Sequence, residues 1–404
     1  MAVGQGIYKK LAYKKQSALG TAASGGSGQL LRREKATFTK SKGTFNSDEI
    51  TSHQQYTGDS YGAGKAMGEI SGVLSALTYS ALIASLLRKD LAATSAITGL
   101  SLTIAGSGPY TITRGSGDFL TGGIKVGDVL RITAGTYTGT ARDINVLVTG
   151  VTATVITCIV PNGSTLTAQG PISSSTITVI GKKSFVPATG HTNDYYTFEE
   201  YQSDLTRSRA WVDQQIAKAE IAVPPNGNGT IQLSCLGLSL SRTGAQVLTS
   251  PSAETTTGIL SAVNAAILIA GSKTVVGTSL SLTIDGQMSH GEEVISSQSL
   301  SDIVKGDVKV SGSISVLNEG ETYGGYFDNE TAVSIICVLF ADATATSSFV
   351  SFVIPRAKLF SDDRDDGKKQ LVETHTFTAE YNGAAGGTSL ATDVGICTYQ
   401  DSDA

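Results

Sequence analysis

Residues 36–79, ATFTKSKGTFNSDEITSHQQYTGDSYGAGKAMGEISGVLSALTY, decide the fold because a similar stretch returns 244 positions later. At residues 280–323 the chain reads LSLTIDGQMSHGEEVISSQSLSDIVKGDVKVSGSISVLNEGETY. The alignment needs no gap, places Gly68 on Gly312, and ends on Thr-Tyr in both copies. Each copy has the pattern of a strand, a long polar loop and a second strand. Self-similarity at a fixed distance indicates a repeated structural unit.

A second pair of segments matches at a shift of 138. Trp211 falls on Phe349 and Ile221 falls on Leu359. Both segments have the pattern of strand, turn, strand, with turn-forming residues at 224–229. Because 244 − 138 = 106, the first copy holds about 106 additional residues. That is the size of an inserted domain.

These matches divide the chain into four parts. We expect an N-terminal arm at 1–28, a first repeat at 29–93 plus 184–247, an insert at 94–183 and a second repeat at 248–404. In the insert, short segments rich in Thr, Val and Ile alternate with glycine turns, which predicts a small β barrel or sandwich. We expect this inserted domain to lie on the outside of the protein as a decoration, and the two repeats to fold and assemble without it.

Composition favours a β-dominated fold with one short packing helix per repeat. The segments 80–87 and 330–340 are apolar nearly all round, so each is expected to form a buried helix. Charged residues make up only 16% of the chain, well below the usual quarter, while Gly numbers 46. The resulting prediction is two tandem β-sandwich or barrel repeats plus the inserted β domain.

Net charge and cysteine placement exclude several functional classes. A net charge of −5 argues against a protein that coats nucleic acid. The four cysteines are scattered without a CxxC pair, which predicts neither a zinc site nor a disulfide framework and suits a reducing cytoplasm. The longest apolar run, near 262–270, is too short for a membrane helix, so no membrane span is expected.

Motifs for catalysis and ligand binding are incomplete. Residues 58–62, Gly-Asp-Ser-Tyr-Gly, match the G-x-S-x-G elbow of serine hydrolases, but a polar stretch precedes them and the second copy lacks the serine. The calcium-like loop at 362–373 has Arg364 at a ligand position. We therefore predict no enzyme activity and no catalytic, cofactor or metal residues, with a hydrolase using Ser60 as a remote alternative.

Two long loops are candidates for contacts between subunits. The loops at 40–64 and 285–306 far exceed the two to five residues of an ordinary hairpin. At matched positions each places two acidic residues beside an aliphatic one. The residues expected to contact a stacked neighbour are Asp48, Glu49, Ile50, Glu292, Glu293 and Val294.

The two ends of the chain carry opposite charge. Residues 1–42 hold nine Lys or Arg against one acid, and residues 360–404 hold nine acids against three basic residues. The arm has no convincing strand or helix, so we expect it to order only against a neighbouring subunit. The expected contacts join Lys9, Lys10, Tyr13, Lys14 and Lys15 to Asp362, Asp363, Asp365 and Asp366.

Several of these residues resemble a known family. The segment Leu30-Leu31-Arg32-Arg33, the Glu49-Ile50 loop, the strand at 68–72 and the hairpin at 211–240 are similar to tail tube proteins of tailed bacteriophages, closest to the double-repeat type of long, non-contractile tails. The resemblance covers both repeats, about three quarters of the chain. The insert departs from it.

The resemblance implies a structural virion protein. Its subunits would form homotrimeric, pseudo-hexameric rings that stack into a hollow conduit for ejection of double-stranded DNA, with no cofactor. It also implies assembly in the host cytoplasm and contacts with the tail tip or baseplate and with tail terminator or tape-measure proteins. Two alternatives stay open: a tube protein of a contractile tail or secretion device, and a capsid or tail decoration or receptor-binding protein.

Overall fold

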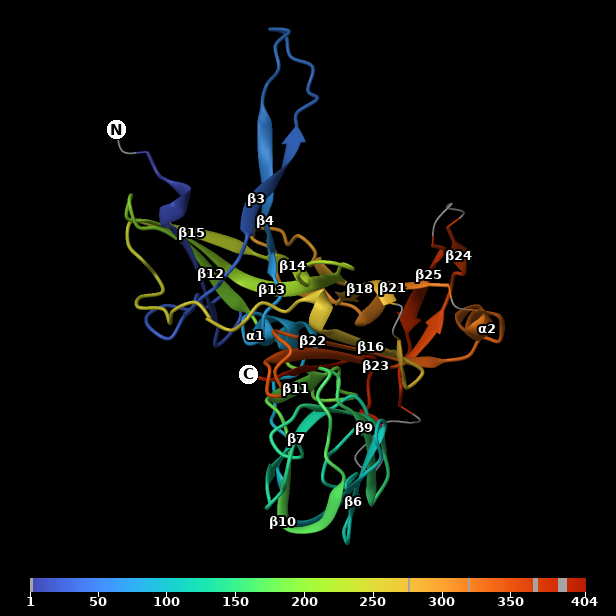
Figure 1. Ribbon diagram of the computed structural model, residues 1–404. Coiled ribbons are helices and arrows are strands. Elements are labelled where there is room, and N and C mark those ends of the chain that lie inside the picture. Colours follow the sequence, from blue (N-terminus) through green and yellow to red (C-terminus); the bar gives the residue numbers. More distant parts are fainter. Residues whose placement is uncertain (1–2, 275–276, 319, 366–369, 384–390) are drawn as a thin grey trace.

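The computed structural model describes residues 3–274, 277–318, 320–365, 370–383 and 391–404. Figure 1 shows a body of β-sheets from which a long hairpin projects on one side and a small barrel on the other. Strands dominate, and the described residues contain two α-helices, both short. The predicted β-dominated fold is confirmed. Neither helix is long and apolar enough to cross a bilayer.

The first repeat and the N-terminal segment supply half of the body. Their elements are η1 (Gly6–Tyr8), β1 (Lys9–Lys15), β2 (Gln29–Leu30), β3 (Lys35–Asn46), β4 (Asp59–Val73), α1 (Ser80–Leu86), β11 (Lys182–Phe185), β12 (Tyr196–Gln202), β13 (Arg207–Val223), β14 (Thr230–Gly237) and β15 (Ser239–Thr243).

The other elements form the barrel and the second repeat. The barrel strands are β5 (Ile97–Ala105), β6 (Tyr110–Arg114), β7 (Val129–Ala134), β8 (Val146–Val151), β9 (Val155–Ile159) and β10 (Gln169–Val179). The second repeat has η2 (Ala262–Asn264), β16 (Ala265–Ile269), β17 (Ser272–Thr274), β18 (Gly277–Asp285), β19 (Met288–His290), β20 (Ile303–Lys305), β21 (Lys309–Leu317), α2 (Thr322–Asp328), β22 (Val333–Phe340), β23 (Phe349–Leu359), β24 (Asp363–Arg364), β25 (Val372–Ala379) and β26 (Thr398–Asp401).

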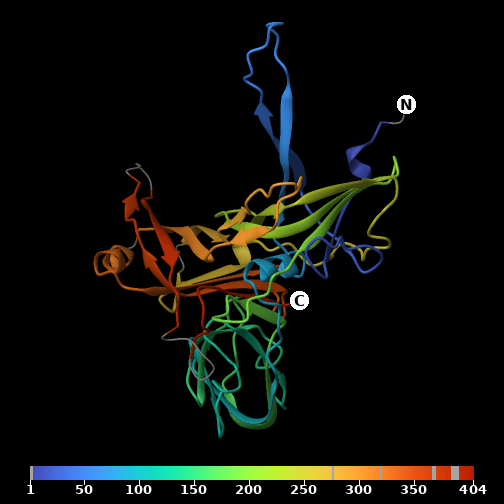
Figure 2. The same ribbon diagram turned by 180° about the vertical axis from the view of Figure 1, so that it is seen from behind.

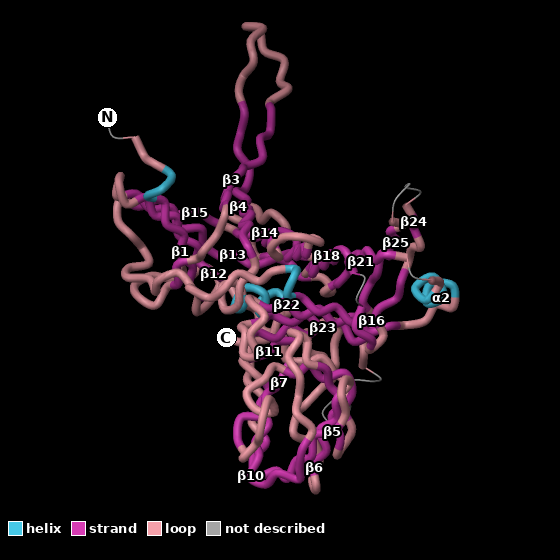
Figure 3. Tube along the Cα trace, viewed as in Figure 1, coloured by secondary structure: helices cyan, strands magenta, loops and turns pink. Residues whose placement is uncertain are grey.

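The repeated segments pair in the same way. In the β3–β4 pair Ala36 lies opposite Ile70, and in the β18–β21 pair Leu280 lies opposite Ile314, each 244 residues later. The strand order β3-β4-β14-β13 recurs as β18-β21-β25-β23. Because β13 also pairs with β18, the two orders join into one run of eight strands, which crosses the body in Figure 3.

The second sequence match is displaced by four residues. Ile70 pairs with Leu233, and Ile314, its counterpart, pairs with His375, so β14 and β25 correspond at a shift of 142 rather than 138. Side chains alternate between the two faces of a strand with a period of two. A four-residue displacement preserves that alternation, which is why the apolar pattern matched at the wrong shift.

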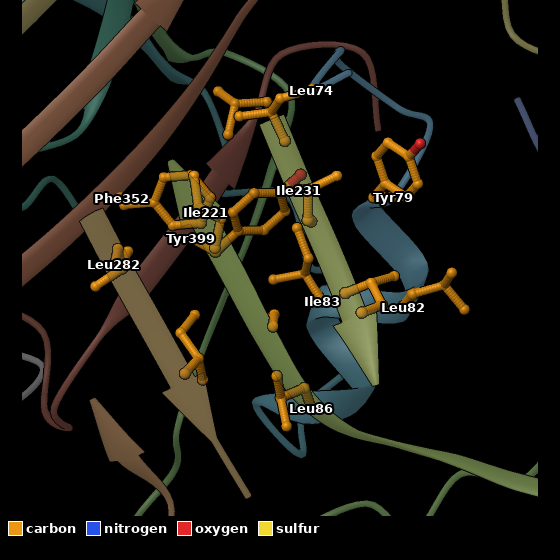
Figure 4. Close-up of a cluster of buried hydrophobic side chains, with 14 of the residues drawn as sticks. Leu74, Tyr79, Leu82, Ile83, Leu86, Ile221, Ile231, Leu282, Phe352 and Tyr399 are labelled. Carbon is orange, nitrogen blue, oxygen red and sulfur yellow. The ribbon is translucent and has the colours of Figure 1, made fainter. Parts of the chain in front are cut away.

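Of the two expected helices, the first is confirmed. Helix α1 lies within 80–87 and buries Leu82, Ile83 and Leu86. Figure 4 shows these side chains beside Ile221, Ile231 and Leu282 of the sheet. Tyr79 just before the helix donates its hydroxyl to the carbonyl of Arg32 at 2.9 Å. The helix therefore covers the apolar face of the eight-stranded run.

The expected helix at 330–340 is wrong. Residues 333–340 form β22, which pairs with β16 on one side and β23 on the other. Helix α2 lies earlier, at Thr322–Asp328. Seven of the eight residues of β22 are buried, and a strand buried on both faces has a continuous apolar sequence that periodicity cannot distinguish from a buried helix.

The insert forms a closed barrel with the strand order β10-β5-β6-β9-β8-β7 and a core of its own. Figure 2 shows this barrel from behind, projecting from the body. Its regular structure spans 97–179. Lys182 and Lys183, which the sequence placed in the insert, lie in β11, and β11 pairs with β26 of the body.

Contacts at the base of the barrel hold it against the second repeat. Val129 and Leu147 share a buried apolar cluster with side chains of β16, β22 and β23. The side chain of Gln400 accepts a hydrogen bond from the amide of Val129 at 2.9 Å and donates to the carbonyls of Val129 at 2.9 Å and Ile180 at 2.7 Å. The barrel is thus attached through a packed junction and not only through its two chain connections.

Candidate assembly surfaces

The hairpin β3–β4 carries the first expected stacking loop to its outermost end (Figure 1). Asp48 and Glu49 are exposed and Ile50 is fully exposed. Large apolar side chains on the same hairpin are also exposed: Phe45, Tyr56 and Tyr61. Apolar side chains that stay in contact with water do not stabilise a monomer. Exposed apolar side chains gathered on one element are typical of interaction sites.

The second expected loop lies against the root of this hairpin. The amide of Gly64 donates to the carbonyl of Gln298 at 3.0 Å, and Lys65 lies 3.7 Å from Glu293. Leu300 and Ile303 pack in a small apolar cluster with Ala63. The structure therefore does not make the two loops equivalent, although their flanking strands are.

Of the second loop's expected residues, Glu292, Glu293 and Val294 are all exposed, and Glu293 lies 3.7 Å from Lys65 of its own subunit. An intersubunit role for all six loop residues stays a prediction.

The expectation that the N-terminal arm has no regular structure is wrong. Strand β1 pairs with β12 along its whole length, with Lys9 opposite Gln202 and Lys15 opposite Tyr196. Leu11 and Tyr13 are buried, and the Tyr13 ring stacks on Phe198 at 5.9 Å. Flanking lysines masked this strand in the sequence, since a lysine stem can cover apolar surface while its amine stays in water.

Three of the arm's four lysines bind groups of their own subunit, two of them carboxylates. Lys9 pairs with Glu200, and the Lys15 amine lies 2.9 Å from Asp194 and 3.1 Å from Asp90. The Lys14 amine donates to two backbone carbonyls at 2.8 and 2.6 Å. Lys10 is exposed and makes no ion pair with the described residues. The predicted contact with the acidic segment of a neighbour is untested, but at most one of these four lysines is unengaged.

The acidic segment forms the β24–β25 hairpin. Asp362, Asp363 and Asp365 are exposed, while Asp366 lies outside the described residues. Beneath them Glu373 and His375 are buried. The Arg364 guanidinium lies 3.0 Å from the Glu373 carboxylate, which also accepts the Asn318 amide.

One arrangement of possible metal ligands occurs here among the described residues. Asp362, Glu373 and His375 each place one ligand atom within 4.8 Å of the others. His375 Nδ1 binds the Ser361 carbonyl at 2.8 Å, and its Nε2 lies 3.5 Å from Glu373. Because Arg364 already supplies a positive charge to Glu373, a cation would compete with that guanidinium, and the trio is better described as polar groups around the Arg364–Glu373 ion pair.

The serine of the hydrolase-like motif lies in a setting unlike an active site. Ser60 is near the start of β4 on the projecting hairpin, and its Oγ lies 3.5 Å from the Phe45 carbonyl. A nucleophile elbow needs a sharp turn between a strand and a helix, with a histidine as base. Ser60 lies within a strand, and among the described residues no histidine hydrogen-bonds to it.

The eight-stranded run has two chemically different faces. One row of paired residues crosses all eight strands and is polar throughout: Lys35, Ser71, Gln232, Glu220, Thr283, Ser311, Thr378 and Lys358. The neighbouring row crosses six of them and is apolar: Ala36, Ile70, Leu233, Ala219, Ile284 and Val310. The apolar face packs on α1 and the core, so the polar face is the one left to contact solvent or a partner.

Sequence reasoning missed the sheet edges as candidate sites. Strand β3 carries Lys35, Lys40 and Lys42, all exposed, and no acid. At the other end of the run, Phe360 is 58% exposed next to the acidic hairpin. In the sequence, the charged residues of segment 35–46 are all lysines, and the turn near 362–366 is rich in aspartate. Without the strand order, nothing indicated that these two segments lie at opposite edges of one sheet.

Comparison with known protein families identifies the family of this chain. The sequence model of a family described as phage tail tube protein matches residues 9–385, nearly the whole chain. No curated protein matches the chain.

Proposed function

Because the chain belongs to the phage tail tube protein family, we propose that it is the tube subunit of a long, non-contractile tail. In this proposal three copies form a ring, rings stack into a hollow tube, and the genomic DNA passes through the tube into the host. The protein is thus a structural component of the virion tail and has no catalytic role.

The repeated pairing carries the proposal. Both copies of the β-hairpin have the same register at a shift of 244, and both continue into the same strand order. A chain with two equivalent units needs three copies to present six units around an axis. If the eight-stranded runs of the three copies join into one closed barrel, no sheet edge stays exposed. Exposed sheet edges are otherwise sites of aggregation.

The polar face supports a role as a conduit. Its central row has side chains that are mostly hydroxyls or amides, with charges only at Lys35, Glu220 and Lys358. Tight DNA binding requires many Lys or Arg contacts to phosphates. A wall of this composition would contact DNA weakly, as passage requires, and the net charge of −5 agrees with it.

The proposed partners follow from the family. A finite tube needs a tail tip or baseplate at one end, a terminator at the other, and a tape-measure protein that sets its length. Assembly would take place in the host cytoplasm. The four buried, unpaired cysteines agree with assembly in a reducing compartment.

Negative-stain microscopy of the purified chain tests the proposal, together with the mass of the smallest assembly. We expect hollow tubes with a regular axial repeat, built from trimers, with knobs on the outside where the barrels lie. Rings of six copies would contradict the pseudo-sixfold arrangement. A protein that stays monomeric, or binds preformed capsids without forming tubes, would favour a decoration protein, and a co-purifying sheath protein would favour a contractile tail.

A further inference from the structure

One turn of the body has a sequence prone to chemical change. The turn between β13 and β14 reads Pro-Pro-Asn-Gly-Asn-Gly at residues 224–229. Where glycine follows asparagine, the glycine nitrogen can attack the carbonyl carbon of the asparagine side chain, because glycine has no Cβ to obstruct the approach. The chain contains four such pairs: Asn162-Gly163, Asn226-Gly227, Asn228-Gly229 and Asn382-Gly383.

The first pair of the turn is unrestrained at the reacting atoms. The Asn226 side chain is exposed and makes no hydrogen bond with the described residues. The backbone N–H of Gly227 likewise donates to none of them, although the Gly227 carbonyl accepts the Ala262 amide at 2.9 Å. The attacking nitrogen and the attacked carbon can therefore approach each other without breaking a hydrogen bond of the fold.

The second pair of the turn is restrained through its backbone. Gly229 is buried, and its amide donates to the Leu260 carbonyl at 2.9 Å while its carbonyl accepts the Leu74 amide at 2.8 Å. These two bonds fix the glycine between two other segments of the body. The Gly229 nitrogen would have to leave Leu260 before it could attack Asn228, although the Asn228 side chain is itself exposed.

The two pairs outside the turn are restrained through the asparagine side chains. The Asn162 amide donates to the Thr344 carbonyl at 2.6 Å. Asn382 is buried and donates to the Thr392 hydroxyl at 2.9 Å and to the Asp393 carbonyl at 3.2 Å. A side chain held in this way cannot turn its carbonyl carbon toward the next nitrogen without losing a hydrogen bond.

We propose that Asn226 is a site of spontaneous deamidation and that the fold protects the other three asparagines. The Gly227 nitrogen bonds to Cγ of Asn226, its proton passes to the departing NH2 group, and that group leaves as ammonia. Water then opens either carbonyl of the resulting succinimide ring, so the products are aspartate and isoaspartate. The reaction needs no oxidant, reductant or enzyme, and the proposal does not depend on the proposed function.

Deamidation would change both the charge and the backbone of the turn. Either product adds a carboxylate, which is negatively charged at neutral pH. Isoaspartate also lengthens the main chain by one carbon atom just before Gly227. Because the Gly227 carbonyl accepts the Ala262 amide ahead of β16, we expect isoaspartate to weaken that bond and to speed hydrogen exchange at Ala262.

Peptide mass spectrometry of the folded, full-length chain after incubation at mildly alkaline pH tests the proposal. Heavy-oxygen water labels each succinimide that opens during the incubation, and electron-transfer fragmentation distinguishes isoaspartate from aspartate. We expect Asn226 to react about tenfold faster than Asn228, because the attack at Asn228 must first break a hydrogen bond. Asn226→Gln should abolish the product at this position, since glutamine would have to close a larger ring. Asn228→Gln is the matched control and should leave the rate at Asn226 unchanged.

The same incubation in urea shows whether the fold causes the difference. Once the chain is unfolded, the four pairs should react at similar rates. Equal rates at Asn226 and Asn228 in the folded chain would overturn the proposal, and so would a folded chain in which Asn226 stays intact while the unfolded chain reacts. A difference between Asn226 and Asn228 that persists undiminished in urea would refute protection by the fold.

Discussion

Removing the charge of Lys183 should destabilise the junction between the barrel and the body. The Lys183 amine lies 3.0 and 3.2 Å from the two oxygens of Asp128 and 3.3 Å from Asp393. Burial disfavours the ammonium, but the two carboxylates overcome that effect and raise the pKa of Lys183. Lys183→Met keeps most of the side-chain volume and leaves the buried Asp128 carboxylate without its cation.

The expected cost is large for a single substitution. Removing one partner of a buried ion pair typically costs about 3–5 kcal/mol, because the remaining charge stays desolvated. Asp128 is 3% exposed and keeps one backbone hydrogen bond, from the amide of Lys125 at 2.9 Å. Burial already raises the pKa of Asp128. Without Lys183 this carboxyl should take up a proton more easily when folded than when unfolded, so the deficit should shrink as the pH falls.

Guanidinium unfolding of the full chain measures the effect. Trp211 is the single tryptophan and is buried in the body, so its fluorescence reports the body, while limited proteolysis between residues 88 and 96 reports detachment of the barrel. Lys182→Met is the matched control, since Lys182 is the exposed neighbour in the same strand and should change stability by less than about 0.5 kcal/mol. Adding Asp128→Asn to Lys183→Met should recover part of the loss. Equal stability of the Lys183 and Lys182 variants would refute the anchoring role of this cluster.

Four further outcomes are expected. Asp48→Lys with Glu49→Lys should leave the unfolding midpoint unchanged, because both residues are exposed, but shorten the tubes seen by microscopy; tubes of normal length would remove the hairpin tip from the stacking contact. Deleting residues 1–15 should prevent stable folding because it removes β1 with buried Leu11 and Tyr13, whereas deleting 1–7 should be tolerated; circular dichroism would separate the two, and a folded 16–404 protein would contradict this account. Gly312→Ala should cost about 1–3 kcal/mol, because its methyl group would lie 2.1 Å from the Ser281 carbonyl oxygen, while Gly325→Ala, in open space, should not destabilise; equal effects in chemical unfolding would argue against close packing at Gly312. Burial and nearby Arg88 lower the pKa of Lys305 to about 8, so the folded state binds fewer protons than the unfolded state between pH 8 and 10.5; Lys305→Gln should therefore raise the melting temperature at pH 7, with the gain fading above pH 8 and absent by about pH 10.5, and a gain independent of pH would refute this origin.

The repeat could be predicted from sequence because its signal is a pattern that both copies share. Gly68 and Gly312 match in the sequence, and each lies opposite an apolar residue of its partner strand, Phe38 or Leu282. Strand β22 could not be separated from a helix, since a run such as Val-Ser-Ile-Ile-Cys-Val-Leu-Phe is apolar on every side. Strand β1 was missed because only Leu11, Ala12 and Tyr13 carry its burial among four lysines.

The candidate surfaces were predicted less completely. The tip residues Asp48, Glu49 and Ile50 are exposed on the projecting hairpin, as a stacking contact requires. The partners of Lys9 and Lys15 were missed because Glu200 and Asp194 lie far away in sequence, across an insert whose size hides the β1–β12 pairing. Strand order, and with it the identity of the open edges, depends on such distant pairings and cannot be derived from local pattern.

The β13–β14 pair of the first repeat and the β23–β25 pair of the second differ in the side chains that they bury. In the first repeat Ile231 and Leu233 of β14 face the core beside an edge that β18 already covers. At the corresponding positions, 142 residues later, β25 has Glu373 and His375, both buried. The Arg364 guanidinium lies 3.0 Å from the Glu373 carboxylate, and Asp362 lies 3.9 Å from the His375 ring. Inward-pointing charges at a sheet edge discourage indiscriminate pairing with other strands.

The exposed aspartates above them add repulsion between identical edges. The buried charges of the second repeat, at positions that are apolar in the first, are therefore expected where a sheet must resist indiscriminate pairing.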